Sequence, residues 1–443
     1  MGKEFCGSVI VPGSRVYNKA RQIFNRSIQK YPASIIYCED ENAVVRAVQA
    51  AGKTGHAVRV RSGGHNYEGF SVGNCAEVID VSCMNTVTLD EASGMLTAGP
   101  GVLNSALYET MGAYGYPFPS GTCPTVAVAG LTQGGGWGLS ARMFGLTCDS
   151  LVSATLIDAC GRRHIADAAH EQELFFALRG GGGGNFGVVT SLTYRLPPKL
   201  FQVTYVEIEA PSVSKAIAAE FIICFQKWLL MGDRRFTPLA RVYHTPEEPR
   251  GLVLRGIFYG GESQARASLA AFLSLGLDGV FKEMTFLQAI RIVEAGYPPY
   301  ERFTTGGRFA YAPFSIAEAR RIVSLIDDLA EGSVNASVSL YGLGGAVAAI
   351  APDETAFFYR RAINILALST DWEDPAAKGA NLAWFTPRYR VLEGITFGAY
   401  VNFPNIENRD YMRAYYGGNA GRLRCIKGRI DPENLFCFPQ SIR

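Results

Sequence analysis

A histidine and a cysteine, each beside a cluster of glycines, are the residues of this sequence best suited to chemistry. His65 follows Gly63 and Gly64 in the segment RVRSGGHNYEGFS, and Cys123 stands in PSGTCPTVAVAGLTQGGGWGL. Glycines after a strand let backbone N–H groups approach a phosphate, and a cysteine thiolate is a nucleophile. Taken singly, the histidine fits a surface turn equally well, and most lone cysteines are inert.

A third glycine-rich segment, LRGGGGGNFGVVTSLTYRL, contains five consecutive glycines at positions 180–184. A G-x-G-x-x-G pattern can be read in it, but these glycines precede an apolar strand instead of joining a strand to a helix. The dinucleotide-binding Rossmann unit requires the strand–turn–helix order, so NAD is a poor interpretation. Five glycines are also compatible with a flexible linker.

The composition argues against several classes of function. The 443 residues are 48% hydrophobic and 19% charged, which is typical of a folded protein with more than one domain. The formal charge is +2 without a basic tract, so we expect no nucleic-acid partner. No apolar run approaches the roughly 18 residues of a membrane span, and the N-terminal residues lack a secretory pattern. We therefore expect a cytoplasmic protein with no membrane contact.

The ten cysteines form no C-x-x-C pair, so we expect no zinc site, and we expect no other metal. Because the chain is long and shows no secretory signal, a disulfide framework is not expected. Most cysteines should be small, buried hydrophobic residues.

The elements that must position these residues mix helices and strands over the first 194 residues. Residues 34–38 (SIIYC) are predicted to form an apolar strand, and a helix with an acidic start then ends at Gly52. Residues 57–64 form a strand that runs into the glycine turn before His65. A further helix is predicted near residues 18–29.

The pattern changes at RLPPKL (residues 195–200), where two prolines after a strand suggest a domain boundary. Residues 200–390 alternate long helical patterns, such as SVSKAIAAEFIICFQKWLL, with apolar strands, such as LVLRGIFYGG. This alternation is typical of an α+β unit with helices on one face of an antiparallel sheet.

The three glycine-rich segments and the closing segment YYGGNAGRLRCIKGRIDPENLFCFPQSI resemble, in order and wording, the berberine-bridge-enzyme-like branch of the vanillyl-alcohol-oxidase flavoproteins. The closing segment departs from the pattern mainly at Ile430, where the family has an aromatic residue. The resemblance implies a two-domain α+β fold of the PCMH FAD-binding type. It implies an FAD domain (1–196), a substrate domain with an antiparallel sheet covered by helices (197–394), and a C-terminal segment (395–443) that returns to the FAD domain.

The same resemblance implies FAD bound covalently at two points. In the family, the histidine that matches His65 bonds to the flavin 8α-methyl group, and the cysteine that matches Cys123 bonds to flavin carbon 6. Further cofactor contacts are implied at Arg61, Ser62, Gly63, Gly64, Asn66, Thr122, Val126, Gly130, Gly134, Gly135, Gly136, Gly138, Gly187, Val189 and Asn402.

Catalytic roles follow from the resemblance for three residues. Tyr67 matches a position that forms a wall of the active site, and Tyr400 with Asn402 matches a Y-x-N motif whose tyrosine acts as a base. A tyrosine with an ordinary pKa near 10 is a weak base, so Tyr400 would need nearby positive charge or hydrogen bonds to favour its ionised form. A structural role for Tyr67, Tyr400 and Asn402 remains the alternative.

The implied reaction is hydride transfer from an alcohol or sugar hemiacetal carbon to the flavin, with oxygen as acceptor and hydrogen peroxide as product. Val126 matches a position where a small residue admits oxygen, and Leu131 departs from the flavin-contacting histidine of the plant alkaloid enzymes. The expected partners are a small-molecule substrate and oxygen, in a monomer or homodimer. One alternative is an oxidase of an amine or secondary metabolite with an acidic base, for which Glu294 and Glu393 are available. A second is a flavin-binding protein without turnover.

Overall fold

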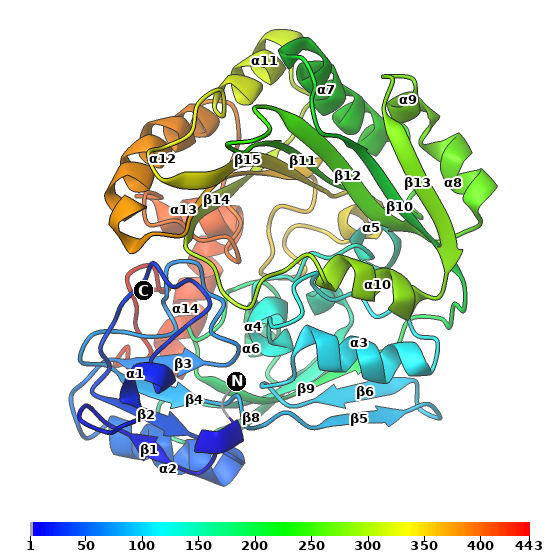
Figure 1. Cartoon of the computed structure of the whole chain (residues 1–443). Coiled ribbons are helices and arrows are strands. Elements are labelled where there is room, and N and C mark those ends of the chain that lie inside the picture. Colours follow the sequence, from blue (N-terminus) through cyan, green and yellow to red (C-terminus); the bar gives the residue numbers. More distant parts are fainter. Residues whose placement is uncertain (1–2) are drawn as a thin grey trace.

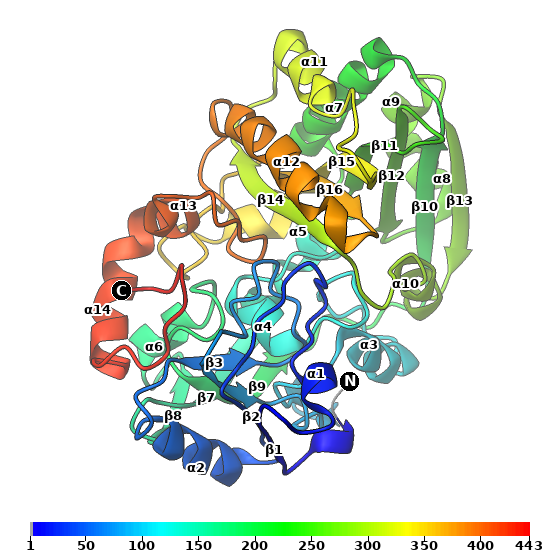
Figure 2. The same cartoon turned by 60° about the vertical axis from the view of Figure 1, so that its left-hand side comes forward.

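The computed structural model describes residues 3–443, whose strands form three sheets arranged in two parts (Figures 1 and 2). The lower part in Figure 1 holds two small sheets, and the upper part holds one large sheet. The first small sheet has the strand order β1-β2-β4-β3, in which β2, β4 and β3 are parallel. Its strands are β1 (Val9–Ile10), β2 (Ser34–Tyr37), β3 (Val58–Arg61) and β4 (Glu77–Asp80).

The second small sheet is antiparallel and has the order β5-β6-β9-β7-β8. Its strands are β5 (Val87–Asp90), β6 (Met95–Ala98), β7 (Leu151–Ile157), β8 (Arg163–Asp167) and β9 (Val188–Arg195). The helices of the lower part are α1 (Tyr17–Ala20), α2 (Glu41–Ala51), α3 (Asn104–Ala113), α4 (Val128–Gln133), α5 (Ala141–Phe144) and α6 (Gln172–Ala177).

The large sheet has seven strands, all antiparallel, in the order β13-β10-β12-β11-β15-β16-β14. They are β10 (Val203–Ala210), β11 (Leu239–His244), β12 (Gly251–Phe258), β13 (Asp278–Met284), β14 (Phe303–Ala310), β15 (Ser333–Gly342) and β16 (Asn364–Trp372). The helices that accompany them are α7 (Lys215–Met231), α8 (Glu262–Ser268), α9 (Ala270–Leu273), α10 (Phe286–Glu294), α11 (Ile316–Ser324) and α12 (Lys378–Glu393).

Helices α7, α11 and α12 cover the outer face of the large sheet, whereas α10 joins the core on its inner side with Tyr205 and Ile257. The rest of the inner face is turned toward the lower part (Figure 1). The outer core packs α7, α11 and α12 against apolar side chains of the sheet. Helix α7 begins where Ser214 accepts a hydrogen bond from the N–H of Ile217, and α11 begins with a capping box between Ser315 and Glu318. These helix starts and the antiparallel sheet agree with the α+β pattern predicted from the sequence.

The C-terminal segment runs back to the lower part (Figure 2). It contains α13 (Tyr411–Tyr416) and α14 (Ala420–Ile430), and beyond α14 Phe436 pairs with Val58 of β3 as a parallel bridge. The ammonium group of Lys427 is buried and bonds both the Asp431 carboxylate and the Phe436 carbonyl, which fixes this last turn. The domain limits at residues 196 and 394 stay a prediction.

Three expectations from the sequence are wrong. In the region of the predicted helix near residues 18–29, the helix spans only Tyr17–Ala20. Farther along, the side chain of Asn25 donates to the carbonyls of Tyr67 and Phe303. The chain also contains a disulfide, between Cys6 and Cys83, that ties the N-terminal segment to the loop after β4. Of the eight remaining cysteines only Cys38 and Cys148 are buried, so most cysteines are not buried as expected.

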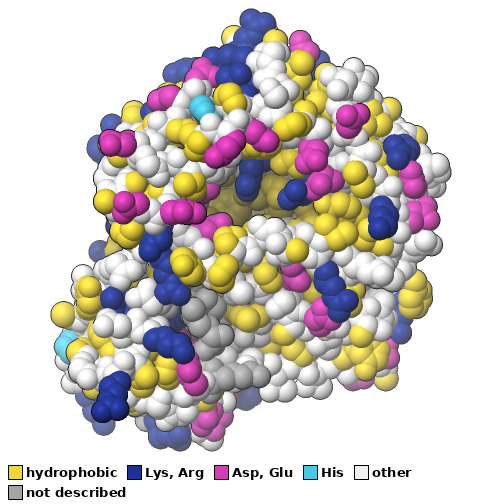
Figure 3. All heavy atoms as spheres, viewed as in Figure 1, with side chains coloured by type: hydrophobic (Ala, Val, Ile, Leu, Met, Phe, Trp, Pro, Cys, Tyr) yellow, Lys and Arg dark blue, Asp and Glu magenta, His cyan; other side chains and the backbone are white. Residues whose placement is uncertain are grey.

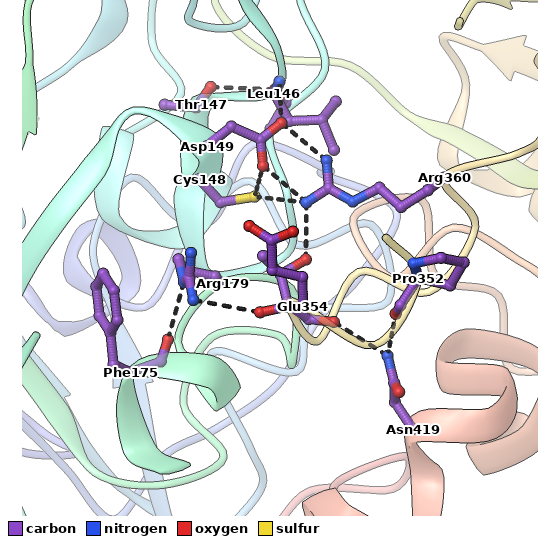
Figure 4. Close-up of polar contacts among 12 residues, drawn as sticks. Leu146, Thr147, Cys148, Asp149, Phe175, Arg179, Pro352, Glu354, Arg360 and Asn419 are labelled. Carbon is purple, nitrogen blue, oxygen red and sulfur yellow. Dashed lines mark hydrogen bonds and ion pairs between the residues drawn. The ribbon is translucent and has the colours of Figure 1, made fainter. Parts of the chain in front are cut away.

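A buried ion pair joins the loop before β16 to the lower part (Figure 4). The guanidinium of Arg360, whose side chain is completely buried, donates two hydrogen bonds of 2.7 and 2.8 Å to the Asp149 carboxylate. The guanidinium also donates a third hydrogen bond, to the Thr355 hydroxyl at 2.7 Å. Asn419 binds the same loop from the C-terminal segment, through the carbonyls of Pro352 and Thr355.

We predict that Arg360→Met destabilises the protein by about 3–5 kcal/mol, because it leaves the Asp149 carboxylate buried without its counter-charge. Urea unfolding followed by fluorescence measures this loss. The control is Arg266→Met, which breaks the exposed pair with Glu262 within α8 and should change stability by at most about 1 kcal/mol. Equal unfolding midpoints for the two variants would contradict the assignment.

Candidate cofactor and substrate cavity

A cavity of about 340 Å³ lies between the inner face of the large sheet and the glycine-rich segments. Figure 3 shows the molecule hollowed between its two parts, with a hydrophobic floor and charged side chains along the upper edge. All three glycine-rich segments reach the wall. From the sequence-predicted set, the wall includes Ser62, Gly63, Gly64, His65, Asn66, Tyr67, Thr122, Cys123, Val126, Gly130, Gly187, Val189 and Asn402.

His65 and Cys123 meet at the hydroxyl of Thr125. The Oγ1 atom of Thr125 lies 2.9 Å from Nε2 of His65 and 3.7 Å from Sγ of Cys123. Asn104, at the start of α3, donates to the Cys123 carbonyl at 3.0 Å and so orients the cysteine loop. The ring of Phe24 stacks on the His65 imidazole with centroids 4.2 Å apart. Two residues far apart in the sequence are therefore held at one place on the wall.

Burial controls the protonation of both side chains. It lowers the pKa of His65 to about 4, so the imidazole is neutral at neutral pH and one ring nitrogen keeps its lone pair. Burial also raises the pKa of the Cys123 thiol, which stays protonated. The pair thus combines a nucleophilic imidazole with a thiol that needs activation before it can react.

Glycines on the lower wall leave room that a side chain would fill. A Cβ atom added at Gly130 would meet no protein atom within 4 Å, and one added at Gly183 would come no closer than 3.7 Å. Both residues line the cavity, Gly130 from α4 and Gly183 from the loop before β9. Bare backbone at these two neighbouring positions lets a flat or phosphorylated ligand approach closely.

Other predicted cofactor contacts lie behind the wall. The guanidinium of Arg61 is buried between the Asp80 carboxylate and the Tyr37 hydroxyl, so it binds protein and does not reach the cavity. Four glycines of the second segment are also absent from the wall, since each packs against another part of the chain. They are Gly134 against Asn402, Gly135 against Phe357, Gly136 against Thr147, and Gly138 against Ser120.

Tyr67 and Tyr400, the two predicted catalytic tyrosines, have different positions. Tyr67 lines the cavity, where its ring stacks on Phe403 at 5.4 Å. Tyr400 is buried behind the wall, and its hydroxyl oxygen accepts the N–H groups of Gly136 and Trp137 at 3.1 and 3.2 Å.

Asn402 is the last residue of the Y-x-N motif. Its amide donates to the Tyr400 hydroxyl at 3.2 Å and to the Leu131 carbonyl at 2.9 Å. The N–H donors favour ionised Tyr400, but burial outweighs them and raises its pKa to about 12. Its role as a base stays a prediction.

The sheet side of the wall carries charges that the sequence did not reveal. Arg241 on β11, Glu301 just before β14 and Asp371 on β16 all line the cavity. No motif marks them, and only the pairing of distant strands brings them together. The acidic residues considered from the sequence lie elsewhere: Glu294 is on α10 outside the wall, and Glu393 pairs with Arg308.

Comparison with known proteins gives two family matches. Residues 32–167 match the FAD binding domain family, and residues 399–443 match the family described as berberine and berberine like. The FAD-linked oxidoreductase YgaK of Bacillus subtilis (strain 168), described as uncharacterized, is 34% identical over 98% of this chain and 96% of its own. The xylooligosaccharide oxidase of Thermothelomyces thermophilus is 28% identical over 95% of this chain and 88% of its own.

The fold also matches a solved structure. BBE-like 1 of Physcomitrella patens superposes with a TM-score of 0.90 at 26% identity, over 99% of this chain and 97% of that chain. This match confirms the predicted two-domain α+β fold. No helix within residues 3–443 has the length and apolar character needed to cross a membrane.

We predict that Gly130→Val reduces the FAD bound per chain by at least about tenfold, because a side chain there would occupy the cavity and not displace protein. The measurement is the ratio of flavin to protein absorbance after purification. The control is Gly421→Val on α14, another helical glycine whose added Cβ meets no atom within 4 Å. FAD retention by both variants would contradict the placement.

Proposed function

This chain belongs to the berberine-bridge-enzyme-like family of FAD-linked oxidoreductases, and from this premise we propose that it holds its FAD through covalent bonds to His65 and Cys123. We further propose that it oxidises a CH–OH carbon with oxygen as the final acceptor. The observation that carries the proposal is the meeting of the two side chains at the Thr125 hydroxyl. A covalent link at two points requires this convergence.

The chemistry of the two side chains fits a flavin. With Nε2 of His65 bonded to Thr125, the other ring nitrogen, Nδ1, is left to form a bond. The thiol of Cys123 lies near the same hydroxyl, which stabilises a thiolate once one forms. Gly130 and Gly183 leave the space that the rest of the cofactor would take. When bound, FAD supplies the two-electron acceptor and passes the electrons to oxygen.

The substrate side of the cavity fits a hydroxylated molecule. Ser337 and Ser339 of β15 and Ser369 of β16 place hydroxyl groups on the wall, beside the rings of Tyr297 and Tyr341. Hydroxyl groups and aromatic faces together bind alcohols and sugars through hydrogen bonds and apolar contact. The related xylooligosaccharide oxidase is named for a sugar substrate, which supports an alcohol or hemiacetal carbon as the electron donor. The products are then a carbonyl compound and hydrogen peroxide.

The proton acceptor is a separate part of the reaction. Tyr400 was predicted from the sequence, but at a pKa of about 12 it is almost entirely protonated at neutral pH. Its hydroxyl holds the Gly136–Trp137 turn, behind the wall on which substrate would lie. The geometry favours an acceptor on the wall itself.

We predict that the purified protein stays yellow after denaturation and washing, and that its mass exceeds the polypeptide mass by that of one FAD. His65→Ala and Cys123→Ala should each retain flavin through the remaining link, with an altered absorbance spectrum. The double variant should release all its flavin, because no covalent attachment remains.

The control for the tether is Cys224→Ala. Cys224 has the same intermediate exposure as Cys123 but lies on α7, away from the cavity. This variant should keep both links and an unchanged spectrum. Complete release of flavin from the denatured wild-type protein would refute the covalent bonds without refuting FAD binding.

We predict that Val126→Leu slows reoxidation of the reduced flavin by oxygen by about tenfold, which is about 1.4 kcal/mol of barrier. Val126 lines the cavity, and a longer side chain there narrows the approach to the ring. Stopped-flow mixing of the reduced protein with oxygenated buffer measures the rate. Anaerobic reduction by substrate in the same variant is the internal reference. An unchanged oxygen reaction would show that Val126 does not control access.

A further inference from the structure

We propose that the carboxylate of Glu301 accepts the substrate proton in this reaction. The inference rests on the proposed oxidation of a CH–OH carbon. It assigns a catalytic residue on a segment that no sequence motif marks. Glu301 stands between α10 and β14, at the seam of the two parts, and lines the same cavity as His65 and Cys123.

The backbone of Glu301 is fixed against the lower part. Its N–H donates to the Phe24 carbonyl at 3.2 Å, and its carbonyl accepts the Arg26 N–H at 2.7 Å. Phe24 is the residue whose ring stacks on His65. On the other side, Phe303 meets Tyr67 edge to face at 5.1 Å. Glu301 is therefore anchored between the proposed flavin attachment site and the predicted wall tyrosine.

The carboxylate of Glu301 is free to accept a proton. Among residues 3–443 it has neither a hydrogen-bond donor nor an ion-pair partner. Asp371, the other carboxylate on the wall, is already bonded to the Asn335 amide at 2.6 Å. Arg241 donates through Nε to the Ser339 hydroxyl at 3.2 Å. A partly buried carboxylate without a partner inside a cavity points to a ligand.

The charges around Glu301 place its proton affinity near neutrality. Burial raises its pKa to about 7, Asp371 adds to the rise, and Arg241 opposes it. A general base works best when its pKa lies near the working pH. The other titratable groups that share the cavity wall with it are His65, Tyr67, Cys123, Tyr297, Tyr341, Tyr415 and Tyr416.

The step balances within the proposed reaction. Conversion of CH–OH to C=O removes a hydride from carbon and a proton from oxygen. The hydride and its electron pair go to the bound FAD. The hydroxyl proton goes to the Glu301 carboxylate, which becomes a carboxylic acid and later returns the proton to solvent.

Anaerobic reduction of the holoenzyme with cellobiose, xylobiose and benzyl alcohol tests the role of Glu301. Glu301→Gln should slow flavin reduction by about 100-fold or more, while FAD stays attached. In the wild type the rate should rise as pH increases through about 7 and then level off, since only ionised Glu301 accepts a proton. The matched control is Glu294→Gln. Burial also raises the pKa of Glu294 to about 7, but this residue is outside the wall, so the variant should keep the rate and its pH profile.

A second readout needs no substrate. Infrared difference spectra of the oxidised holoenzyme between pH 5 and pH 9 report the carboxyl groups that titrate. Glu301→Gln should remove one carboxyl signal with a midpoint near 7. In Asp371→Asn the midpoint of that signal and of the rate profile should both fall, because a repelling charge is lost.

The outcomes separate the two proposals. If the wild type is reduced by an alcohol or sugar and Glu301→Gln is reduced equally fast, Glu301 is not the acceptor and the proposed function stands. If no probe reduces the wild type but an amine does, the proposed donor class fails. If Glu301→Gln keeps every carboxyl signal that titrates near pH 7 in the wild type, the assignment of Glu301 is wrong, whatever the substrate is.

Discussion

The side-chain amide of Asn25 holds the two walls of the cavity together. Its nitrogen donates to the Tyr67 carbonyl at 3.1 Å and to the Phe303 carbonyl at 3.0 Å, from a fully buried position. One side chain therefore joins the loop that carries His65 to the strand that follows Glu301. Because the donor has no water to bond with instead, separation of either wall would leave a buried polar group unpaired. The irregular segment around Asn25 is part of the site, although it carries no catalytic group.

Glycine serves two purposes in this fold, and only one concerns the ligand. Gly130 and Gly183 leave space in the cavity. Gly134 and Gly138 instead let protein segments touch, since an added Cβ would lie 1.9 Å from Asn402 Oδ1 and 1.7 Å from the Ser120 carbonyl oxygen. The close packing at Gly134 presses the Y-x-N turn of the C-terminal segment against the second glycine segment. The position of Tyr400 behind the wall follows from this contact.

The elements that depend mainly on neighbouring residues in the sequence were predicted correctly. The strand and glycine turn before His65, the helix that ends at Gly52, and the antiparallel sheet of the second part follow from periodicity and capping. The same patterns carry the segments that hold His65 and Cys123. Local patterns do not show which residues a side chain contacts in the folded chain. Arg61 is therefore predicted to contact the ligand, although its guanidinium is paired with the Asp80 carboxylate in the core. The sequence does not predict Glu301 and Asp371 as site residues, because their proximity depends on the pairing of β14 with β16.

One cause, removal from water, acts on three cavity side chains in different directions. Burial lowers the pKa of His65 and raises the pKa values of Cys123 and Glu301, since it penalises the charged form of each group. The imidazole is thereby kept neutral and able to form a bond. The thiol is kept protonated and therefore needs activation before it can react. The carboxyl group gains a proton affinity near neutral pH. Burial in one cavity therefore shifts all three groups toward their uncharged forms, and Asp371 and Arg241 further adjust the carboxyl group of Glu301.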